Sequence, residues 1–150
     1  MRIPDAYQVA IDRWGGPASD HAGVPEPVVL YAVVQVMHNE VANGSFGQYF
    51  FNDYGAEAKL AIKGLDAIGA KQSAAIAREV VALFGPGGAP ADRARRQKLL
   101  ETIDGGSIER LSDAWLKDPD RLQPLLARYA VAHKEHFATQ TAPATAPVAR

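Results

Sequence analysis

The polar side chains best suited to chemistry lie close together between residues 40 and 52. Glu40, Asn43 and Gln48 place one carboxylate and two amides within a short segment. A catalytic or ligand-binding carboxylate needs a cleft, and usually a shifted pKa. The same three side chains could instead hydrogen-bond to backbone amides and form a structural corner. We expect the structural corner; a solvent-filled pocket beside Glu40, with no backbone amide bonded to it, would favour a small-ligand-binding protein or an enzyme.

Other common catalytic arrangements lack essential parts. The chain has no cysteine, which excludes disulfides, zinc–thiolate sites and a cysteine nucleophile. The glycine-rich loop at residues 85–88 has no Lys-Ser or Lys-Thr after it, as a phosphate-binding loop requires. No serine stands in a Gly-x-Ser-x-Gly sequence. We therefore expect a protein that is not an enzyme and has no cofactor.

The histidines offer one weak alternative, a metal site. His133 and His136 lie three residues apart, with Glu135 between them, and His38 and Glu40 are the only other candidate ligands. His133 also lies on the apolar stripe of its segment. Since two histidines leave a metal site incomplete, we expect no bound metal.

The apolar residues predict an all-α fold. Apolar side chains recur with a period near 3.6 residues from residue 5 almost to the C-terminus, which indicates six to eight helices in one compact domain. The segment Val28–Val41 is apolar nearly all round, as expected of a central, buried helix. Its many valines would also suit a buried strand, but the length of the pattern favours a helix.

Helix-end signals surround the polar segment. Asn43-Gly44 predicts a helix end, and Ser45 with Gln48 predicts a capping box that opens a new helix. Phe46 and Phe50 would then supply core contacts. Further on, Asp92 predicts the start of a helix that runs to residue 103. Asp118-Pro119 predicts the start of a last helix that runs to about residue 137, and Pro124 favours a start near Gln123 as the alternative. We divide the chain into an N-terminal helix and loop (1–27), a helical core (28–137) and a disordered Ala/Thr/Pro tail (138–150).

The polar segment also carries a family resemblance. It resembles the signature Glu-Val-x-Asn-Gly-Gly-Phe-x-Gln-Phe-Phe-x-Asn of a bacterial family of DNA-mimic proteins, with Ser45 in place of the second glycine. The matching residues are Glu40, Val41, Asn43, Gly44, Phe46, Gln48, Phe50 and Asn52. The resemblance extends over about residues 28–137. It implies an all-helical fold and a non-enzymatic protein-binding role, with a DNA-binding regulator as a possible partner and a function in transcription regulation.

The charges define the expected partner. The net charge is −1, whereas a DNA mimic needs rows of carboxylates, since duplex DNA carries about one charge per 1.7 Å. Residues 1–57 carry a net −5 and residues 58–98 a net +5. This split predicts contact with a protein, or with a second copy in a homodimer, rather than direct nucleic-acid binding. The candidate contact residues are Asp5, Asp12, Asp20, Glu26, Arg93, Arg95 and Arg96.

The arginine cluster and the location of the protein complete these expectations. Arg93, Arg95 and Arg96 follow a predicted helix start, where cations oppose the helix dipole. They could face acidic groups inside the fold; we expect them to be exposed for contact.

No apolar run reaches the roughly 18 residues of a membrane span, and the first twelve residues have no signal-type apolar core. We expect a cytoplasmic protein.

Overall fold

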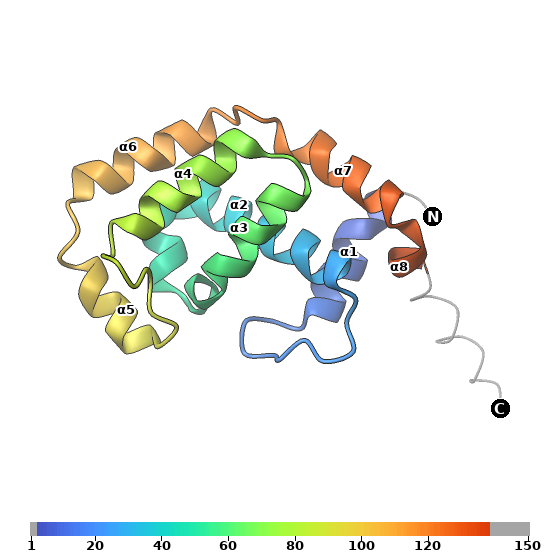
Figure 1. Ribbon diagram of the computed structural model, residues 1–150, viewed down its shortest axis with the longest axis horizontal. Helices are drawn as coiled ribbons and strands as arrows, with labels where there is room; N and C mark the ends of the chain where they lie inside the picture. Colours follow the sequence, from blue (N-terminus) through green and yellow to red (C-terminus); the bar gives the residue numbers. More distant parts are fainter. Residues whose placement is uncertain (1–2, 139–150) are drawn as a thin grey trace.

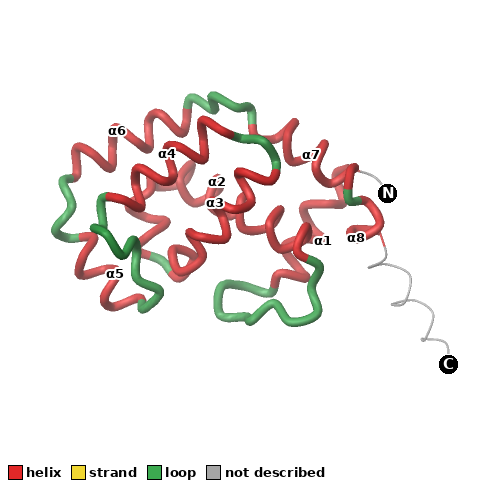
Figure 2. Tube along the Cα trace, viewed as in Figure 1, coloured by secondary structure: helices red, strands yellow, loops and turns green. Residues whose placement is uncertain are grey.

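The computed structural model describes residues 3–138, with side chains from residue 6 to residue 137. The described chain is all-α and compact, without a strand, as predicted (Figures 1 and 2). Its elements are α1 (Ile3–Trp14), α2 (Glu26–Phe51), the 3-10 helix η1 (Asp53–Glu57), α3 (Ala58–Ala67), α4 (Lys71–Ala82), α5 (Arg93–Leu100), α6 (Gly105–Leu116), α7 (Leu122–Ala132) and α8 (Lys134–Ala138).

Helix α2 is the centre of the fold. It runs through the middle of the molecule and contacts α1, α3, α5, α6, α7 and α8 (Figure 1). Its residues from Val28 to Gln35 are all buried, which explains why its sequence is apolar on nearly every side. The segment that could have been a strand is therefore a helix.

Helix α3 packs against α2 at very short range. A Cβ atom placed on Gly64 would lie 2.9 Å from the Leu30 carbonyl oxygen and 2.7 Å from a Val34 methyl group. Only glycine fits at this crossing without moving one of the two helices. Gly64 thereby allows α3 to lie close to the first half of α2.

The predicted helix break near Asn43-Gly44 is confirmed as a kink inside α2. Gly44 is extended (φ −170°), and Ser45 is left-handed (φ 83°, ψ 172°). The helical pattern resumes directly after Ser45 and ends at Phe51. The two halves of α2 therefore point in different directions, and the side chains of the motif are divided between two faces.

Several helix ends differ from the predictions. Asp92 caps α5 as predicted, by accepting a hydrogen bond from the Arg95 amide at 2.9 Å, but α5 ends at Leu100 instead of continuing to residue 103. Helix α7 begins at Leu122, one residue before the alternative start at Gln123, so the prediction that Asp118-Pro119 directly opens it is wrong. Asp118 still accepts from the Leu122 amide at 3.0 Å.

Two further features follow from the position of α7. Pro124 falls in its first turn, where the missing N–H disrupts no helical hydrogen bond. Asp120 accepts a hydrogen bond from the Ser73 amide at 2.5 Å and so caps α4 from a distant part of the chain.

The last segment of the chain is described only in part. A break at His133 separates α7 from the short α8, where the sequence predicted one continuous helix. Of the predicted disordered tail at 138–150, Ala138 is the last residue of α8, and residues 139–150 lie outside the described residues. Among the helices of the described chain, none combines the length and apolar character needed to cross a membrane.

Candidate functional site

The kink divides the predicted polar corner between two sides of α2. Glu40, Gln48 and Asn52 meet on one side. Asn43 and Gly44 line a groove on the other side, together with Ser45. The structure therefore does not bring Asn43 to Glu40, and the corner contains two separate candidate sites.

Glu40 is bound by side-chain amides. Its Oε1 atom accepts from Asn52 Nδ2 at 2.9 Å and from Gln48 Nε2 at 3.4 Å. No backbone amide among the described residues bonds to this carboxylate, so the expectation of pairing with buried backbone amides is wrong. The Oε2 atom has no hydrogen-bond or ion-pair partner in the described part of the chain.

A pocket opens beside Glu40, and we call it the Glu40 pocket. Its volume is about 390 Å³, and its lining residues are Pro17, Glu40, Asn52, Asp53, Tyr54 and Arg93. Arg93 forms an ion pair with Asp53 at 2.9 Å, so Glu40 supplies the uncompensated charge of the lining. This arrangement meets the condition that favours a ligand-binding role for Glu40.

The aromatic residues of the motif form core contacts, as predicted. Phe46 and Phe50 are fully buried. Phe46 packs edge-on against Trp115 of α6, with 5.4 Å between ring centroids, and Phe50 lies 4.9 Å from Phe84. These contacts fix the second half of α2 against its neighbours. Phe51, by contrast, is 52% exposed.

Ser45 stabilises the kink through its hydroxyl group. Its Oγ accepts from the Gly47 amide at 3.0 Å, while the Gln48 side chain is bonded to Glu40. The predicted capping box is therefore only half present. Ser112 of α6 accepts from the Phe46 amide at 2.9 Å, so a side chain from another helix satisfies the backbone that the kink exposes.

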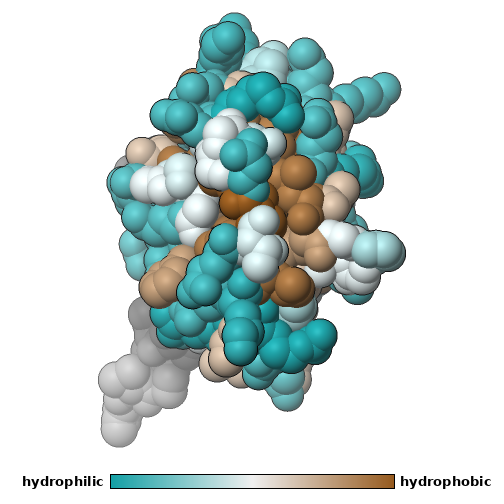
Figure 3. Space-filling view, turned by 90° about the vertical axis from the view of Figure 1, so that its left-hand side faces the viewer, coloured by the Kyte–Doolittle hydropathy of each residue, from teal (hydrophilic) through white to brown (hydrophobic). Residues whose placement is uncertain are grey.

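A groove lies along this kink, and we call it the kink groove. Its volume is about 550 Å³. It is lined by Asn43, Gly44 and Ser45, by the apolar Val41, Leu100, Ile103, Ile108 and Leu116, by the acidic Glu109 and Asp113, and by Ala42, Gly47, Gly105 and Ser112. Figure 3, which looks onto the end of the molecule that holds α5 and the start of α6, shows hydrophobic residues gathered in the middle of this face with polar residues around them.

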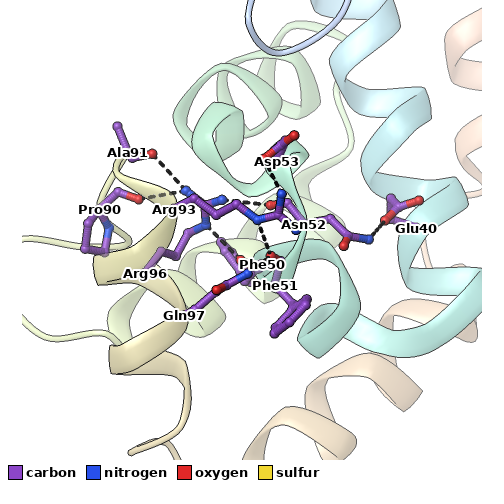
Figure 4. A network of polar contacts seen from close by, with 10 residues as sticks. All are labelled: Glu40, Phe50, Phe51, Asn52, Asp53, Pro90, Ala91, Arg93, Arg96 and Gln97. Atoms are coloured by element: carbon purple, nitrogen blue, oxygen red, sulfur yellow. Dashed lines mark hydrogen bonds and ion pairs between the residues drawn. The ribbon is translucent and has the colours of Figure 1, made fainter.

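Arg96 is buried, so the expectation of an exposed contact residue is wrong at this position. Its exposure is 0%, and Figure 4 shows its guanidinium group among backbone carbonyls. It donates to the carbonyls of Phe50 at 2.8 Å and Asn52 at 2.7 Å, and to those of Pro90 and Ala91 at 3.1 and 3.0 Å. Carbonyls at a helix C-terminus lack intrahelical partners and attract a cation. Arg96 therefore caps α2.

The neighbours of Arg96 support the same helix end. Arg93 and Gln97 both donate to the Phe51 carbonyl, at 3.2 and 2.8 Å (Figure 4). Arg93 and Arg96 are unfavourable for the dipole of α5, but they stabilise the C-terminal end of α2. Arg95 is exposed, and of the three predicted contact arginines it is the one whose side chain makes no hydrogen bond or ion pair within the described chain.

Burial shifts the pKa values of two ionisable groups in this region. Desolvation by burial lowers the pKa of Arg96, whose hydrogen-bond acceptors are neutral carbonyls. Desolvation also raises the pKa of Tyr49, which is 1% exposed, and the nearby Glu57 adds to this effect. Both shifts belong to groups that hold the helices together.

A second buried polar network has no clear signal in the sequence. Trp14 Nε1 donates to Glu57 Oε1 at 2.8 Å, and His21 bonds to the other oxygen of Glu57. The second nitrogen of His21 lies 3.1 Å from the Trp14 carbonyl oxygen. The network anchors the loop between α1 and α2 to η1. Its residues are far apart in the sequence, so only the tertiary fold shows that they interact.

The remaining predicted contact residues are scattered. Glu26 pairs with Lys63 at 2.6 Å, and Asp12 accepts from the Gln8 side chain. Asp20 accepts from the Ala22 amide, and the side chain of Asp5 lies outside the described part. The three described acids therefore bond to partners in different parts of the chain: Lys63 of α3, Gln8 of α1 and the Ala22 amide of the following loop.

The predicted metal alternative gains no site from the geometry. Within the described residues, no three His, Asp or Glu side chains are grouped as metal ligands would be. His133 and His136 lie 6.4 Å apart between ring centroids, and His133 packs on Tyr129. His38 lies beside Trp115 of α6, with 6.4 Å between ring centroids.

Comparison with known proteins identifies the family. The model of the DMP19-like protein family matches residues 22–133, well over half of the chain. No curated protein and no solved structure gives a significant match. The matched segment contains the whole Glu40–Asn52 motif, all lining residues of the kink groove and every lining residue of the Glu40 pocket except Pro17. It confirms the resemblance to DNA-mimic proteins. The chain belongs to the DMP19-like protein family.

Proposed function

We propose that this chain is a non-enzymatic protein-binding member of the DMP19-like family, and that the kink groove is its contact surface. The observation that carries the proposal is the composition of this groove. Its floor is apolar, and Leu116 at its edge is 47% exposed. Exposed apolar surface surrounded by polar residues is typical of protein-contact sites. The groove also includes the motif residues Asn43 and Gly44.

The hydroxyl groups of the groove support a binding role rather than catalysis. Ser45 Oγ accepts from the Gly47 amide, and Ser112 both accepts from the Phe46 amide and donates to the Ile108 carbonyl at 2.7 Å. A catalytic serine needs a neighbouring base that can take its proton. Both serines here are bonded to the backbone and stabilise the kink instead.

The acidic edge of the groove favours a basic, helical partner. Glu109 and Asp113 lie one turn apart on α6 and are exposed, with no ion pair between them and the described cations. An apolar groove between helices suits an amphipathic helix, and its cations would face these two acids. A DNA-binding regulator in the cytoplasm could present such a helix. Recognition would then depend on this local contact, because a net charge of −1 is far from the charge density of a DNA backbone.

A capture experiment tests the proposal. The tagged wild-type chain and a Leu116→Glu variant are incubated with lysate of the native host, and the retained proteins are identified by mass spectrometry. Val131→Glu is the matched control, since Val131 is equally exposed (51%) but lies on α7. We expect a protein that wild type and control retain and that Leu116→Glu loses. Equal retention by all three chains would contradict the proposal, and self-association through the groove would appear as a dimer lost in the same variant.

A further inference from the structure

A second site of different chemistry lies on the other side of α2. The Glu40 pocket is separate from the kink groove, and no lining residue belongs to both. We propose that the Glu40 pocket binds a guanidinium group. The inference does not depend on the proposed function of the groove.

The charge of the pocket calls for a cation. Of its charged lining residues, Asp53 and Arg93 neutralise each other at 2.9 Å, and Arg93 also donates to the Phe51 carbonyl. Glu40 then leaves one negative charge. Its Oε1 is engaged by Asn52 and Gln48, whereas Oε2 has no partner in the described chain. A carboxylate oxygen of this kind is an acceptor for a charged N–H donor.

The position of this carboxylate is fixed before any ligand binds. Two amide groups hold Glu40: that of Gln48, in the second half of α2 beyond the kink, and that of Asn52, directly after the last residue of α2. Asn52 is itself held, because its backbone carbonyl accepts from Arg96 at 2.7 Å (Figure 4). A group already oriented for its ligand loses little freedom on binding, which favours affinity.

The other walls suit a flat cation with an apolar stem. Tyr54 lines the pocket, and its ring is stacked on Trp14 with 6.1 Å between centroids. Pro17 adds an apolar wall. A guanidinium group is planar, donates several N–H groups to a carboxylate and packs well against aromatic rings. The pocket volume of about 390 Å³ is near the lower end for small-molecule sites, which are about 300–1,000 Å³.

This chemistry could come from a free guanidino compound or from an arginine of a bound protein. We would titrate the isotope-labelled chain with n-butylguanidinium and with a short capped Gly-Arg-Gly peptide, and follow backbone amide shifts by NMR. The matched neutral controls are n-butylurea and the same peptide with citrulline in place of arginine. Saturable shifts at Asn52 and Tyr54 with n-butylguanidinium would support a free ligand. Shifts with the arginine peptide alone would support a protein side chain as the source.

Variants test the role of the carboxylate. Glu40→Gln keeps an oxygen that can accept from Asn52 and removes the charge, so we expect affinity to fall about tenfold or more. Glu101→Gln, an exposed carboxylate outside the pocket, should bind as wild type does. Tyr54→Leu provides a second test, with an expected several-fold loss. Equal binding of the neutral controls, unchanged affinity in Glu40→Gln, or no saturable shift with either guanidinium probe would overturn the proposal.

Discussion

At the scale of single residues, the backbone of Ser45 is the most unusual feature of the motif. Its φ of 83° and ψ of 172° lie in a region that is almost restricted to glycine. The family signature has glycine at this position. The serine is accommodated because its hydroxyl accepts from the Gly47 amide. Ser45 thus combines backbone strain with a compensating hydrogen bond.

Replacing this serine should stabilise the protein. Ser45→Gly removes a strain of about 1–3 kcal/mol and loses a hydrogen bond of about 0.5–1.5 kcal/mol. We expect a net gain of about 1 kcal/mol in the free energy of unfolding, measured by urea denaturation. Ser45→Ala removes the hydrogen bond and keeps the strain, so it should be less stable than wild type. A destabilised Ser45→Gly variant would show that the hydroxyl group matters more than the backbone conformation.

Tyr49 predicts a specific sensitivity to alkaline pH. Its pKa in the folded state is raised above the ordinary value of about 10. Below about pH 10 the phenol is neutral in both states, and its contribution to stability is complete. Above that pH it ionises readily only in the unfolded chain, so stability falls as pH rises.

The comparison with Tyr49→Phe isolates this effect. Between pH 9 and pH 11, wild type should lose about 1.4 kcal/mol more unfolding free energy than the variant, which corresponds to one pH unit beyond the unfolded pKa. Urea denaturation at several pH values measures the difference. Parallel pH profiles would mean that Tyr49 ionises as easily in the folded state as in the unfolded chain.

At the scale of elements, α5 is joined to the end of α2 by Arg96. Its guanidinium group binds four backbone carbonyls, and two of them, Phe50 and Asn52, are at the C-terminus of α2. Arg96→Met would leave these buried acceptors unpaired, and we expect a loss of about 3–5 kcal/mol in thermal or urea unfolding. The matched control is Arg95→Met on the exposed side of α5, which should stay within about 0.5 kcal/mol of wild type. Equal stability of the two variants would contradict the capping role.

The crossing of α2 and α3 gives a second prediction at this scale. Gly64→Ala places a methyl group against the Leu30 carbonyl and Val34, so it should destabilise the fold by about 1–3 kcal/mol. Gly105→Ala is the control, because a Cβ there meets open space. That control should be neutral or more stable by up to about 1 kcal/mol. Differential scanning calorimetry of both variants would measure these effects, and an unchanged Gly64→Ala would show that the helices can separate without loss.

The sequence predicted those elements that depend on local signals. The period of apolar residues gave the helices, Asp92 gave a correct cap, and Asn43-Gly44 marked the kink to within one residue. Positions set by distant partners were missed. Asp118 accepts from the Leu122 amide at the start of α7, and Asp120 accepts from the Ser73 amide of α4. Both contacts depend on how the chain turns after α6.

The candidate site was predictable in its residues but not in its geometry. The motif identified Glu40, Asn43 and Gln48, yet the kink separates Asn43 from the other two. Arg96 was expected on the surface because its position disfavours its own helix, and the compensating carbonyls lie in α2, some forty residues earlier. Tyr54 and Pro17 carried no sequence signal, since loop geometry alone brings them to Glu40.

At the scale of the whole molecule, the two candidate sites differ in charge and in shape. The kink groove is mainly apolar with an acidic edge, whereas the Glu40 pocket is small and polar. Apart from Pro17 of the Glu40 pocket, the lining residues of both sites lie within the segment that matches the family model, and both sites depend on the kink in α2. For the molecule as a whole, we propose that a protein partner occupies the groove.

Site-specific photo-crosslinking tests this claim most directly. The photoreactive residue p-benzoylphenylalanine would replace Leu116 in the groove or, as a control, the similarly exposed Val131 on α7. The chains would be expressed in the native host, illuminated, and analysed by mass spectrometry. We expect a discrete crosslinked protein from position 116 that is absent from position 131 and is lost when Ile103→Glu places a charge in the groove. The same crosslinked product from both positions, or none from position 116 while the partner is still captured, would contradict it.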